Sequence, residues 1–496
     1  MLSMRLRNLG RCRLPYHRVA ARGRIMGVLA ALAMAMATVA PAARATGGGA
    51  PPRYAVTILS TLSPDPSLSS ISNGNGINDL DWVVGDANYP GTWTDPSGTI
   101  SYPPNTTEHA TLWRDGRITD LGTLGGPNSS IGFVSRPNDM GLLSGNAQNS
   151  QPDPNGENWG VNFGCTPSGT VPCNGFQYEF RGFEWRAGVI RPLPTLGGNN
   201  EAAFGGGNDE GQIVGMSETA NVDKKCQSAP FYDSATNQVI NLDQQLDWRP
   251  VVWGPTYGET HRLPLHSGDH VGIATAINDE DEVVGGSGIC TPPSFGAVKH
   301  ALLWRGGSMI DLGSLGGSYD NFGTAINDRG QVVGWSDLPG DSLTTGTTHA
   351  FFWQNGAISD LGTLQGDTSS SSSFAYGIND AGQVVGQSCD EYGNCEAVLW
   401  QNGAIYDLNA YSVVNTPGSF DLLQAEGINT RGEIAGIAVD NSTGNTLGFL
   451  AMPCGDPAAG ELGCENNGHL APAPFAQKLA LGGHLSRQSA LLTQRR

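Results

Sequence analysis

The chain has 496 residues, of which 15% are charged, and it contains 70 Gly and 30 Pro. A chain of this length can bury a large core, and so many turn-forming residues favour short strands over helices. Acidic residues outnumber basic ones by 46 to 27. Such a surface repels nucleic acid phosphates and anionic lipid, so we expect neither as a partner.

Residues 1–45 have a composition of their own. They carry eight Arg and no acidic residue, contain an apolar run over 25–40, and end with Ala43 and Ala45 in a small-residue cleavage pattern. This pattern predicts a secretory signal peptide over 1–45, with a short N-terminal anchor as the alternative. The apolar run is short for a membrane span, and no other segment could cross a bilayer. We expect a secreted or periplasmic protein whose mature part keeps 19 of the 27 basic residues and has a net charge of −27.

The chain has nine Cys. Cys12 lies in the leader, so eight remain, and an even number in an exported chain predicts disulfides. The absence of a Cys-x-x-Cys pair makes a zinc knuckle unexpected. Spacing suggests Cys165–Cys173, Cys389–Cys395 and Cys454–Cys464, which leaves Cys226–Cys290. Other pairings stay open, because eight cysteines allow 105 of them.

The stretch INDRGQVVGWS at 326–336 recurs with small changes along the chain, for example as INDAGQVVGQS at 378–388. Its second residue is an Asn in every copy, at Asn78, Asn138, Asn208, Asn278, Asn327, Asn379 and Asn429. Seven units at such a period indicate a solenoid or a propeller.

One unit, residues 349–388, indicates four short strands. HAFFW and AISDLGTL flank Asn355-Gly356, which suits a tight hairpin turn with positive φ. FAYGIND and QVVGQS flank a second turn, in which Asp380 can bond to backbone N–H groups and Gly382 takes the left-handed position. We therefore interpret the Asn and Asp of the motif as turn residues. Seven units predict an all-β, seven-bladed β-propeller of four-stranded antiparallel blades.

The two ends of the repeat region complement each other. The first unit begins with YAVTILSTL (54–62) and lacks an opening strand, whereas GFLAMPC (448–454) is an opening strand with no unit after it. We expect strands from both termini to close the propeller, which spans 46–455, because closure removes exposed sheet edges. Two hairpin-like stretches within 229–265 mean either an insertion in one blade or an eighth blade. Residues 456–496 lose the repeat and are interpreted as a mobile tail.

The units HATLW…DLGTLGG, HALLW…DLGSLGG…INDRGQVVG and HAFFW…DLGTL…INDAGQVVG resemble the HAF-repeat family of bacterial extracellular repeat proteins. The triplet that gives the family its name stands here as His349-Ala350-Phe351. The resemblance covers roughly 54–454 and implies export and a repeat β-fold. It brings no established activity, cofactor or catalytic residue. Two units lack the His, which puts a common role for that side chain in doubt.

Histidines supply two candidate sites. In the first, His109, His300 and His349 open their strands, and imidazoles facing a propeller channel could bind a metal or an acidic ligand. The alternative for each is a hydrogen bond to a neighbouring loop carbonyl.

The second histidine site lies outside the repeat pattern, in HRLPLHSGDHVG. Its residues are His261, His266, His270 and Asp269. Three imidazoles and a carboxylate could bind zinc or copper, and exposed loop histidines are the alternative.

Two further sets recur with the repeat. The turns carry carboxylates that could hold Ca²⁺, most densely at Asp279 and Asp281, although no copy has the run of acids that a full calcium loop needs. The other aspartates of this set are Asp79, Asp139, Asp209, Asp328 and Asp380. Trp residues recur at one position of the repeat, which indicates that they pack in the core between blades. If they are exposed instead, their rings could stack on sugars. They are Trp113, Trp185, Trp253, Trp304, Trp353 and Trp400.

No nucleophile elbow, HExxH motif or P-loop occurs, so we assign no catalytic residue and no cofactor beyond the open Ca²⁺ and Zn²⁺ hypotheses. We expect a monomeric, exported binding or scaffold module that recognises a protein or a polysaccharide. Loop insertions at 150–180 and 218–250 would form the recognition surface. Two alternatives remain. One is a secreted carbohydrate-active hydrolase or lyase with acid residues at the channel mouth. The other is a purely structural envelope protein.

Overall fold

The computed structural model describes most of the repeat region. The described residues are 52–63, 71–98, 101–132, 135–155, 157, 178–224, 229–233, 238–242, 246–289, 297–340, 347–366, 371–414 and 416–454. The predicted signal peptide and the predicted tail lie outside them, as do Cys165, Cys173, Cys226, Cys290 and Cys464. In the described part of the chain, no helix combines the length and the apolar character needed to span a membrane.

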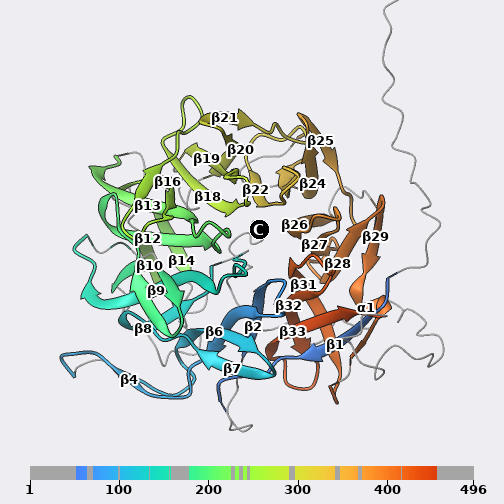
Figure 1. Cartoon of the computed structure of the whole chain (residues 1–496), viewed down its shortest axis with the longest axis horizontal. Coiled ribbons are helices and arrows are strands. Elements are labelled where there is room, and N and C mark those ends of the chain that lie inside the picture. Colours follow the sequence, from blue (N-terminus) through green and yellow to red (C-terminus); the bar gives the residue numbers. More distant parts are fainter. Residues whose placement is uncertain are drawn as a thin grey trace, which may run out of the picture. The chain divides into compact units, whose positions relative to one another are not determined.

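Seven sheets, six of them fully antiparallel, surround a common axis as blades (Figure 1). Each of these six blades has four strands, and each strand pairs with the one that precedes it in the blade. Blade 1 is β2 (Ser72–Ile77), β3 (Val83–Asn88), β6 (Glu108–Arg114) and β7 (Arg117–Asp120); blade 2 is β8 (Gly125–Ser130), β9 (Leu142–Pro152), β10 (Tyr178–Arg186) and β11 (Val189–Pro192); blade 3 is β12 (Gly197–Gly205), β13 (Ile213–Val222), β16 (Leu246–Trp253) and β17 (Thr260–Arg262).

The next three blades follow the same plan. Blade 4 is β18 (Val271–Ile277), β19 (Val283–Ile289), β20 (Ala297–Arg305) and β21 (Ser308–Asp311); blade 5 is β22 (Asn321–Ile326), β23 (Val332–Asp337), β24 (Thr348–Gln354) and β25 (Ala357–Asp360); blade 6 is β26 (Ser372–Ile378), β27 (Val384–Cys389), β28 (Cys395–Gln401) and β29 (Ala404–Asp407). The first strand of each blade lies nearest the axis and the fourth lies at the periphery (Figure 1).

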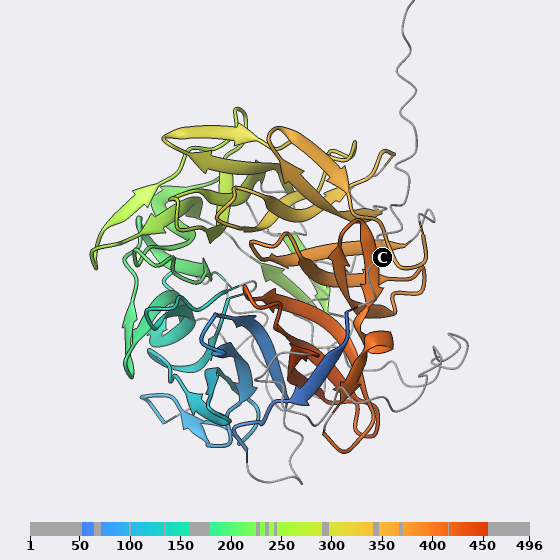
Figure 2. The ribbon, with the colours of Figure 1, turned by 45° about the vertical axis from the view of Figure 1, so that its right-hand side comes forward.

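The seventh blade combines strands from both ends of the described chain. Its first three strands are β31 (Phe420–Ile428), β32 (Ile434–Asp440) and β33 (Thr446–Pro453). β1 (Tyr54–Ile58) pairs antiparallel with β33, and β30 (Ser412–Val414), which follows the short helix α1 (Leu408–Tyr411), adds a strand parallel to β1. In Figure 2 the blue β1 lies along the orange-red strands of this blade. The predicted seven-bladed ring and its closure by both termini are therefore confirmed.

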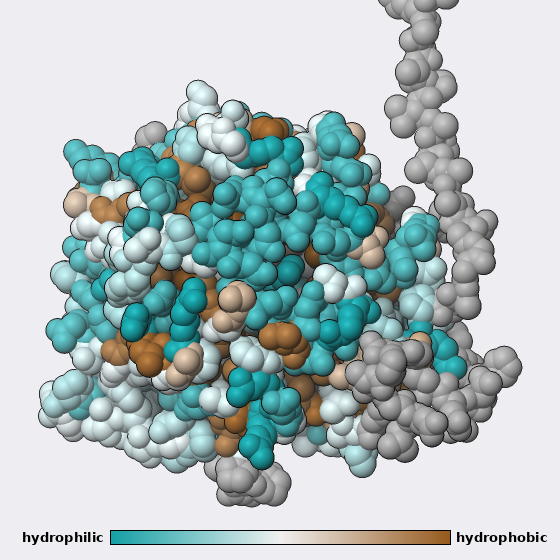
Figure 3. Space-filling view, in the orientation of Figure 1, coloured by the Kyte–Doolittle hydropathy of each residue, from teal (hydrophilic) through white to brown (hydrophobic). Residues whose placement is uncertain are grey.

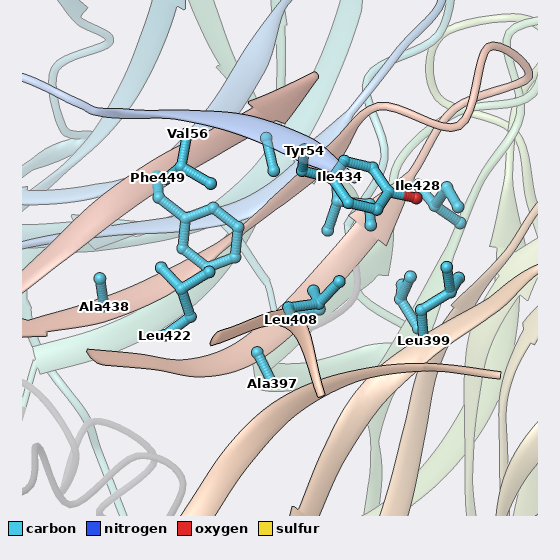
Figure 4. Packing of buried hydrophobic residues seen from close by; sticks show 13 residues of the cluster. Tyr54, Val56, Ala397, Leu399, Leu408, Leu422, Ile428, Ile434, Ala438 and Phe449 are labelled. Atoms are coloured by element: carbon cyan, nitrogen blue, oxygen red, sulfur yellow. The ribbon is translucent and has the colours of Figure 1, made fainter. Parts of the chain in front are cut away.

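A buried core joins the closing blade to blade 6 (Figure 4). Tyr54 and Val56 of β1 are at most 1% exposed and pack in one cluster with Phe449 of β33. Leu408 of α1 and Leu399 of β28 belong to the same cluster. Burying a large apolar side chain stabilises a fold by roughly 1.5–3 kcal/mol. The N-terminal strand is therefore held by side-chain packing as well as by the strand ladder.

The repeat, as it is written in the sequence, is out of phase with the blades by two strands. The HAFFW hairpin, β24–β25, forms the outer half of blade 5, whereas the FAYGIND hairpin, β26–β27, forms the inner half of blade 6. A periodic sequence cannot define where its own unit begins, because every shifted frame has the same period. The closure defines it, since β1 supplies the fourth strand of blade 7.

Strand direction gives the propeller two faces. Because the strands alternate in direction, the turns from first to second and from third to fourth strand lie on one face, which we call the turn face. The connections from second to third strand and from blade to blade lie on the opposite face, which we call the insertion face. The insertions at 150–180 and 218–250 both connect a second to a third strand. They therefore begin and end on the insertion face.

The irregular stretch 229–265 combines an inserted hairpin with the two outer strands of blade 3, and it does not form an eighth blade. Its first part forms a separate two-stranded sheet of β14 (Ala229–Asp233) and β15 (Gln238–Leu242), placed between β13 and β16. A second inserted hairpin, β4 (Trp93–Thr94) and β5 (Ser101–Tyr102), stands between β3 and β6 in blade 1.

The predicted turn and core residues have the expected roles. Asn355 and Gly356 have φ angles of 52° and 83°, as the hairpin turn requires. The six repeated Trp residues are 2–9% exposed, and the indole N–H of Trp304 donates to the carbonyl oxygen of Pro264 at 2.8 Å. They are core residues and not a sugar platform. The face seen in Figure 3 is mostly hydrophilic, with hydrophobic residues scattered over it.

One predicted disulfide is present among the described residues. Cys389 and Cys395 are bonded across the ends of β27 and β28. Cys454 is also disulfide-bonded, and its partner lies outside the described residues. The remaining pairings stay predictions.

Candidate functional site

The seven motif asparagines form a closed ring of hydrogen bonds on the turn face. Each side-chain Nδ2 donates to the backbone carbonyl oxygen of the corresponding Asn in the next blade, at 2.9–3.2 Å. Each Asn is at most 4% exposed. Within its own turn, Oδ1 of Asn327 accepts the backbone N–H groups of Arg329 and Gln331. The motif Asn is therefore a turn residue, as predicted, and it also joins the blades.

The motif aspartates form a second, incomplete ring on the same face. Oδ1 of Asp139 accepts the backbone N–H of Asp79, and the same contact joins each later pair of blades up to blade 6, at 2.8–3.3 Å. Blade 7 has Thr430 at this position, and its N–H donates to Asp79. Asp279 and Asp281 belong to no group of three metal-ligating side chains among the described residues. A calcium site there stays a prediction.

The first strands surround a narrow central channel. A Cβ on Gly76 would lie 1.8 Å from the carbonyl oxygen of Ser135 in the next blade, so the inner strands approach closely enough to require glycine. The cavity in the channel has a volume of about 70 Å³, and Arg136, Tyr376 and Glu426 are among its lining residues. One water needs roughly 10–15 Å³ of such volume, so the cavity has room for a few waters rather than for a polysaccharide.

Glu426 is a buried carboxyl in this lining. Its side chain is 4% exposed, and burial raises its pKa to about 8. Its Oε2 atom has no hydrogen-bond partner among the described residues. Tyr376 of the neighbouring blade is buried as well, and burial, together with the charge of Glu426, raises the pKa of its hydroxyl well above the usual value. At pH 7 most Glu426 side chains are therefore protonated. Sequence reasoning missed both residues, because neither belongs to a recurring motif.

The strand-start histidines do not face the channel. They stand on third strands, and two strands separate each of them from the axis. His109 Nδ1 lies 2.9 Å from Asp120 Oδ2, and His349 Nδ1 lies 2.9 Å from Asp360 Oδ2. The hypothesis of a ring of imidazoles in the channel is therefore wrong. The predicted alternative, a hydrogen bond from each His to a nearby acceptor, is correct except for the acceptor. The partner of each imidazole is the carboxylate of the DLG stretch in the same blade, not a loop carbonyl.

His300, the third strand-start histidine, has different partners. Its Nδ1 lies 2.8 Å from Oδ2 of Asp269, and its ring stacks on that of His266, with 3.8 Å between the ring centroids. Ligating atoms of His266, Asp269 and His300 all lie within 4.8 Å of one another. Among the described residues, this is the single group of three side chains that could hold a metal ion.

The structure divides the second predicted histidine site. His266 and Asp269 join His300, whereas His261 lies exposed on β17 and His270 Nδ1 lies 2.7 Å from Asp223 Oδ2. Sequence reasoning placed His300 in the other set, because its repeat position predicts the same role as in its sister blades. The extra His and Asp of the preceding loop were the signal of a different role.

Buried carboxylates also link blades 2 and 3 close to their insertions. Oε1 of Glu201 accepts the Nε–H of Arg181 at 2.7 Å, and burial raises the pKa of Glu201 to about 8 although Arg181 lowers it. Glu218 Oε2 accepts the backbone N–H of Asn200, whose side chain donates to Asp153. These groups are engaged with one another and do not form an open pair.

Aromatic side chains stand on the insertion face. Trp93 of β4 is partly exposed and lies against Tyr102 and Tyr178, with ring centroids 5.5 and 5.7 Å away. Tyr392, in the disulfide-closed loop of blade 6, is 76% exposed. Exposed Trp and Tyr rings suit ligands that have both apolar faces and polar groups, because each ring combines an apolar surface with a polar N–H or O–H.

No protein-family model matches the chain, and no curated protein matches it. The sialidase of Trypanosoma rangeli in complex with the inhibitor DANA has 9% identity and a TM-score of 0.35, and the match covers 70% of this chain and 57% of that one. A gluconolactonase from Xanthomonas campestris has 11% identity and a TM-score of 0.28, over 55% of this chain and 78% of that one. The intramolecular trans-sialidase from Ruminococcus gnavus has 10% identity and a TM-score of 0.28, over 77% and 93%. The chain is a β-propeller with distant similarity to sialidase and gluconolactonase propellers, and a likeness at this level carries no argument about activity.

Proposed function

We propose that the chain is an exported binding module of the HAF-repeat type whose insertion face recognises a polysaccharide. The observation that carries the proposal is that the links between blades and the inserted loops lie on opposite faces. On the turn face, Asn side chains link all seven blades in a closed ring. The insertions, in contrast, begin and end on the opposite face, where loops can vary without disturbing the blades.

The insertion face offers the chemistry that a sugar chain needs. Trp93 and the exposed ring of Tyr392 supply apolar surfaces on which sugar rings can stack. The carboxylate of Glu391, which is exposed beside Tyr392, can accept hydrogen bonds from sugar hydroxyl groups. The strongly acidic composition of the chain favours a neutral or cationic polysaccharide over an anionic one.

A carbohydrate-active hydrolase or lyase at the channel mouth would need two carboxyl groups facing the substrate, about 5–10 Å apart. In the described channel lining, Glu426 is buried. Asp209 and Asp279, which also line the channel, each accept a backbone N–H from the neighbouring blade. The described lining therefore gives the enzyme no specific support.

Affinity electrophoresis of residues 46–496 through gels that contain single polysaccharides tests the proposal. We expect one neutral or cationic polysaccharide to retard the chain, and Trp93→Ala or Tyr392→Ala to weaken the interaction at least about threefold, equivalent to roughly 0.7 kcal/mol. Tyr257→Ala is the matched control, because Tyr257 is 54% exposed in a third-to-fourth strand connection on the turn face. Retardation that is equally sensitive to Tyr257→Ala, or no retardation in any gel, would overturn the proposal and favour a protein ligand or a structural role.

A further inference from the structure

Blade 4 departs from its sister blades at one position. In blades 1 and 5 the strand-start histidine pairs with the DLG aspartate of its own blade, Asp120 or Asp360. The equivalent aspartate in blade 4 is Asp311, and His300 does not pair with it. His300 instead contacts Asp269, and a second imidazole stands beside it.

The connection between β17 and β18 produces this departure. His266 to Asp269 forms a tight turn, in which the N–H of Asp269 donates to the carbonyl oxygen of His266 at 3.1 Å and Gly268 has a φ of 95°. The backbone N–H of His266 donates to Ser287 Oγ on β19 at 3.2 Å. This turn places one imidazole and one carboxylate over the start of β20, which carries His300.

No described residue forms a hydrogen bond with the imidazole of His266. Its Nδ1 is buried and has no partner among the described residues. Its Nε2 lies 3.7 Å from Oδ2 of Asp311, which is longer than a hydrogen bond. A buried ring nitrogen that lacks a hydrogen-bond partner costs free energy, and coordination of a cation by Nδ1 would remove that cost.

We propose that His266, Asp269 and His300 bind one first-row transition ion, with Zn²⁺ as the reference metal and Asp311 as a fourth ligand. Two neutral imidazoles and one or two carboxylates are donors that Zn²⁺ accepts, whereas Ca²⁺ requires oxygen ligands alone. Ser287 Oγ donates to Oδ2 of Asp269 at 2.5 Å and orients the carboxylate, as residues behind a metal ligand commonly do.

The distances show what binding would change. Zinc bonds of 2.0–2.1 Å in a tetrahedron place the ligating atoms about 3.3 Å apart, whereas these atoms now lie within 4.8 Å of one another. Closing that gap means rotating the stacked rings apart so that one nitrogen of each faces the ion. The side chains of His266 and His300 are 30% and 29% exposed, so the ion can enter from solvent.

Zinc titration of residues 46–496, made without a polyhistidine tag, tests this site by competition with a chromophoric chelator. We expect one Zn²⁺ per chain at pH 7.5, and at least about tenfold weaker binding in His266→Ala and in His300→Ala. His261→Ala is the matched control, because His261 is exposed on the neighbouring β17. It should bind Zn²⁺ as the wild type does.

Two further measurements separate a lost ligand from a lost fold. Co²⁺ should give visible absorption bands in the wild type and in His261→Ala but not in His266→Ala. The melting temperatures of the three proteins without metal should be the same. Zinc should raise the wild-type melting temperature, and EDTA should reverse the rise. No stoichiometric binding, equal loss in His261→Ala, or equal binding of Ca²⁺ would overturn the site. Each readout is independent of polysaccharide binding.

Discussion

The side-chain amide of Asn429 donates a hydrogen bond to the carbonyl oxygen of Asn78, 351 residues earlier in the chain, at 3.1 Å. This contact completes a circle in which every blade holds the next through the same atom pair. It explains why the chain repeats an Asn and not merely a turn-forming residue. A local turn would accept Asp at this position. A carboxylate can only accept hydrogen bonds, whereas the Asn amide offers an acceptor for its own turn and a donor for the neighbouring blade.

Removal of one amide should therefore destabilise the whole ring. In Asn327→Ala, the contact with the carbonyl oxygen of Asn379 is lost, together with the bonds that Oδ1 accepts from Arg329 and Gln331. Because these groups are buried, we expect a loss of about 2–4 kcal/mol in the free energy of unfolding. Denaturation by guanidinium chloride measures it. Ser359→Ala, on the exposed strand β25, should stay within about 0.5 kcal/mol of the wild type; a similarly small effect of Asn327→Ala would show that the ring is not structural.

The N-terminal strand should act as part of the last blade. Tyr54 is 1% exposed in the closing core, and truncation of a buried aromatic residue costs about 3–5 kcal/mol. Tyr54→Ala should therefore lower the melting temperature and speed proteolysis at both ends of the described chain. Thr57→Ala, at an exposed position of the same strand, is the control. Equal melting temperatures for the two variants would contradict closure by β1.

The disulfide between Cys389 and Cys395 closes a short loop at the ends of β27 and β28. Loop-closure entropy for about seven residues predicts a contribution of about 2 kcal/mol. We expect the double variant Cys389→Ser/Cys395→Ser to lose that amount in chemical denaturation. Reducing agent should lower the stability of the wild type, because it breaks this disulfide. In the double variant this loop has no disulfide left to break. An unchanged midpoint after both cysteines are replaced would contradict the expectation.

Stability should fall as the pH rises from about 4.5 to about 8. Burial raises the pKa of Glu426 and of Glu201 to about 8, so the folded state holds protons that the unfolded state releases in this window. Glu426→Gln cannot ionise, so it should be more stable than the wild type at pH 8.5, by up to about 5 kcal/mol, and should show a flatter profile. Denaturation midpoints at pH 5 and pH 8.5 measure the difference. Glu210→Gln, at an exposed position, should reproduce the wild-type profile; a wild-type profile for Glu426→Gln would contradict the assignment.

The sequence predicts the fold well because the repeat is mainly a backbone pattern. Turn chemistry at Asn355-Gly356 and alternating apolar strands specify blades, and the unpaired strand at each end predicts closure. The blade boundaries and the contacts between blades are long-range properties, so neither the phase of the repeat nor the Asn ring follows from one unit.

The candidate site was only half predicted for the same reason. His266 and Asp269 stand out because they break the repeat, whereas His300 conforms to it and gives no signal of its own. Only the turn from His266 to Asp269, placed over β20 by the bond to Ser287, brings the three together. Glu426 gives no sequence signal either, because its pKa depends on burial by neighbouring blades.

The central claim is that stability comes from the ring and recognition comes from the insertion face. Its most direct test is polysaccharide affinity electrophoresis of a variant in which residues 227–244, which include the β14–β15 hairpin, are replaced by two glycines. The hairpin forms a separate sheet, and Val222 and Leu246 are paired at its base, so the blade can close without it. The account predicts a melting temperature close to that of the wild type and at least tenfold weaker retardation. Undiminished retardation, or a fall in melting temperature as large as that of Asn327→Ala, would contradict it.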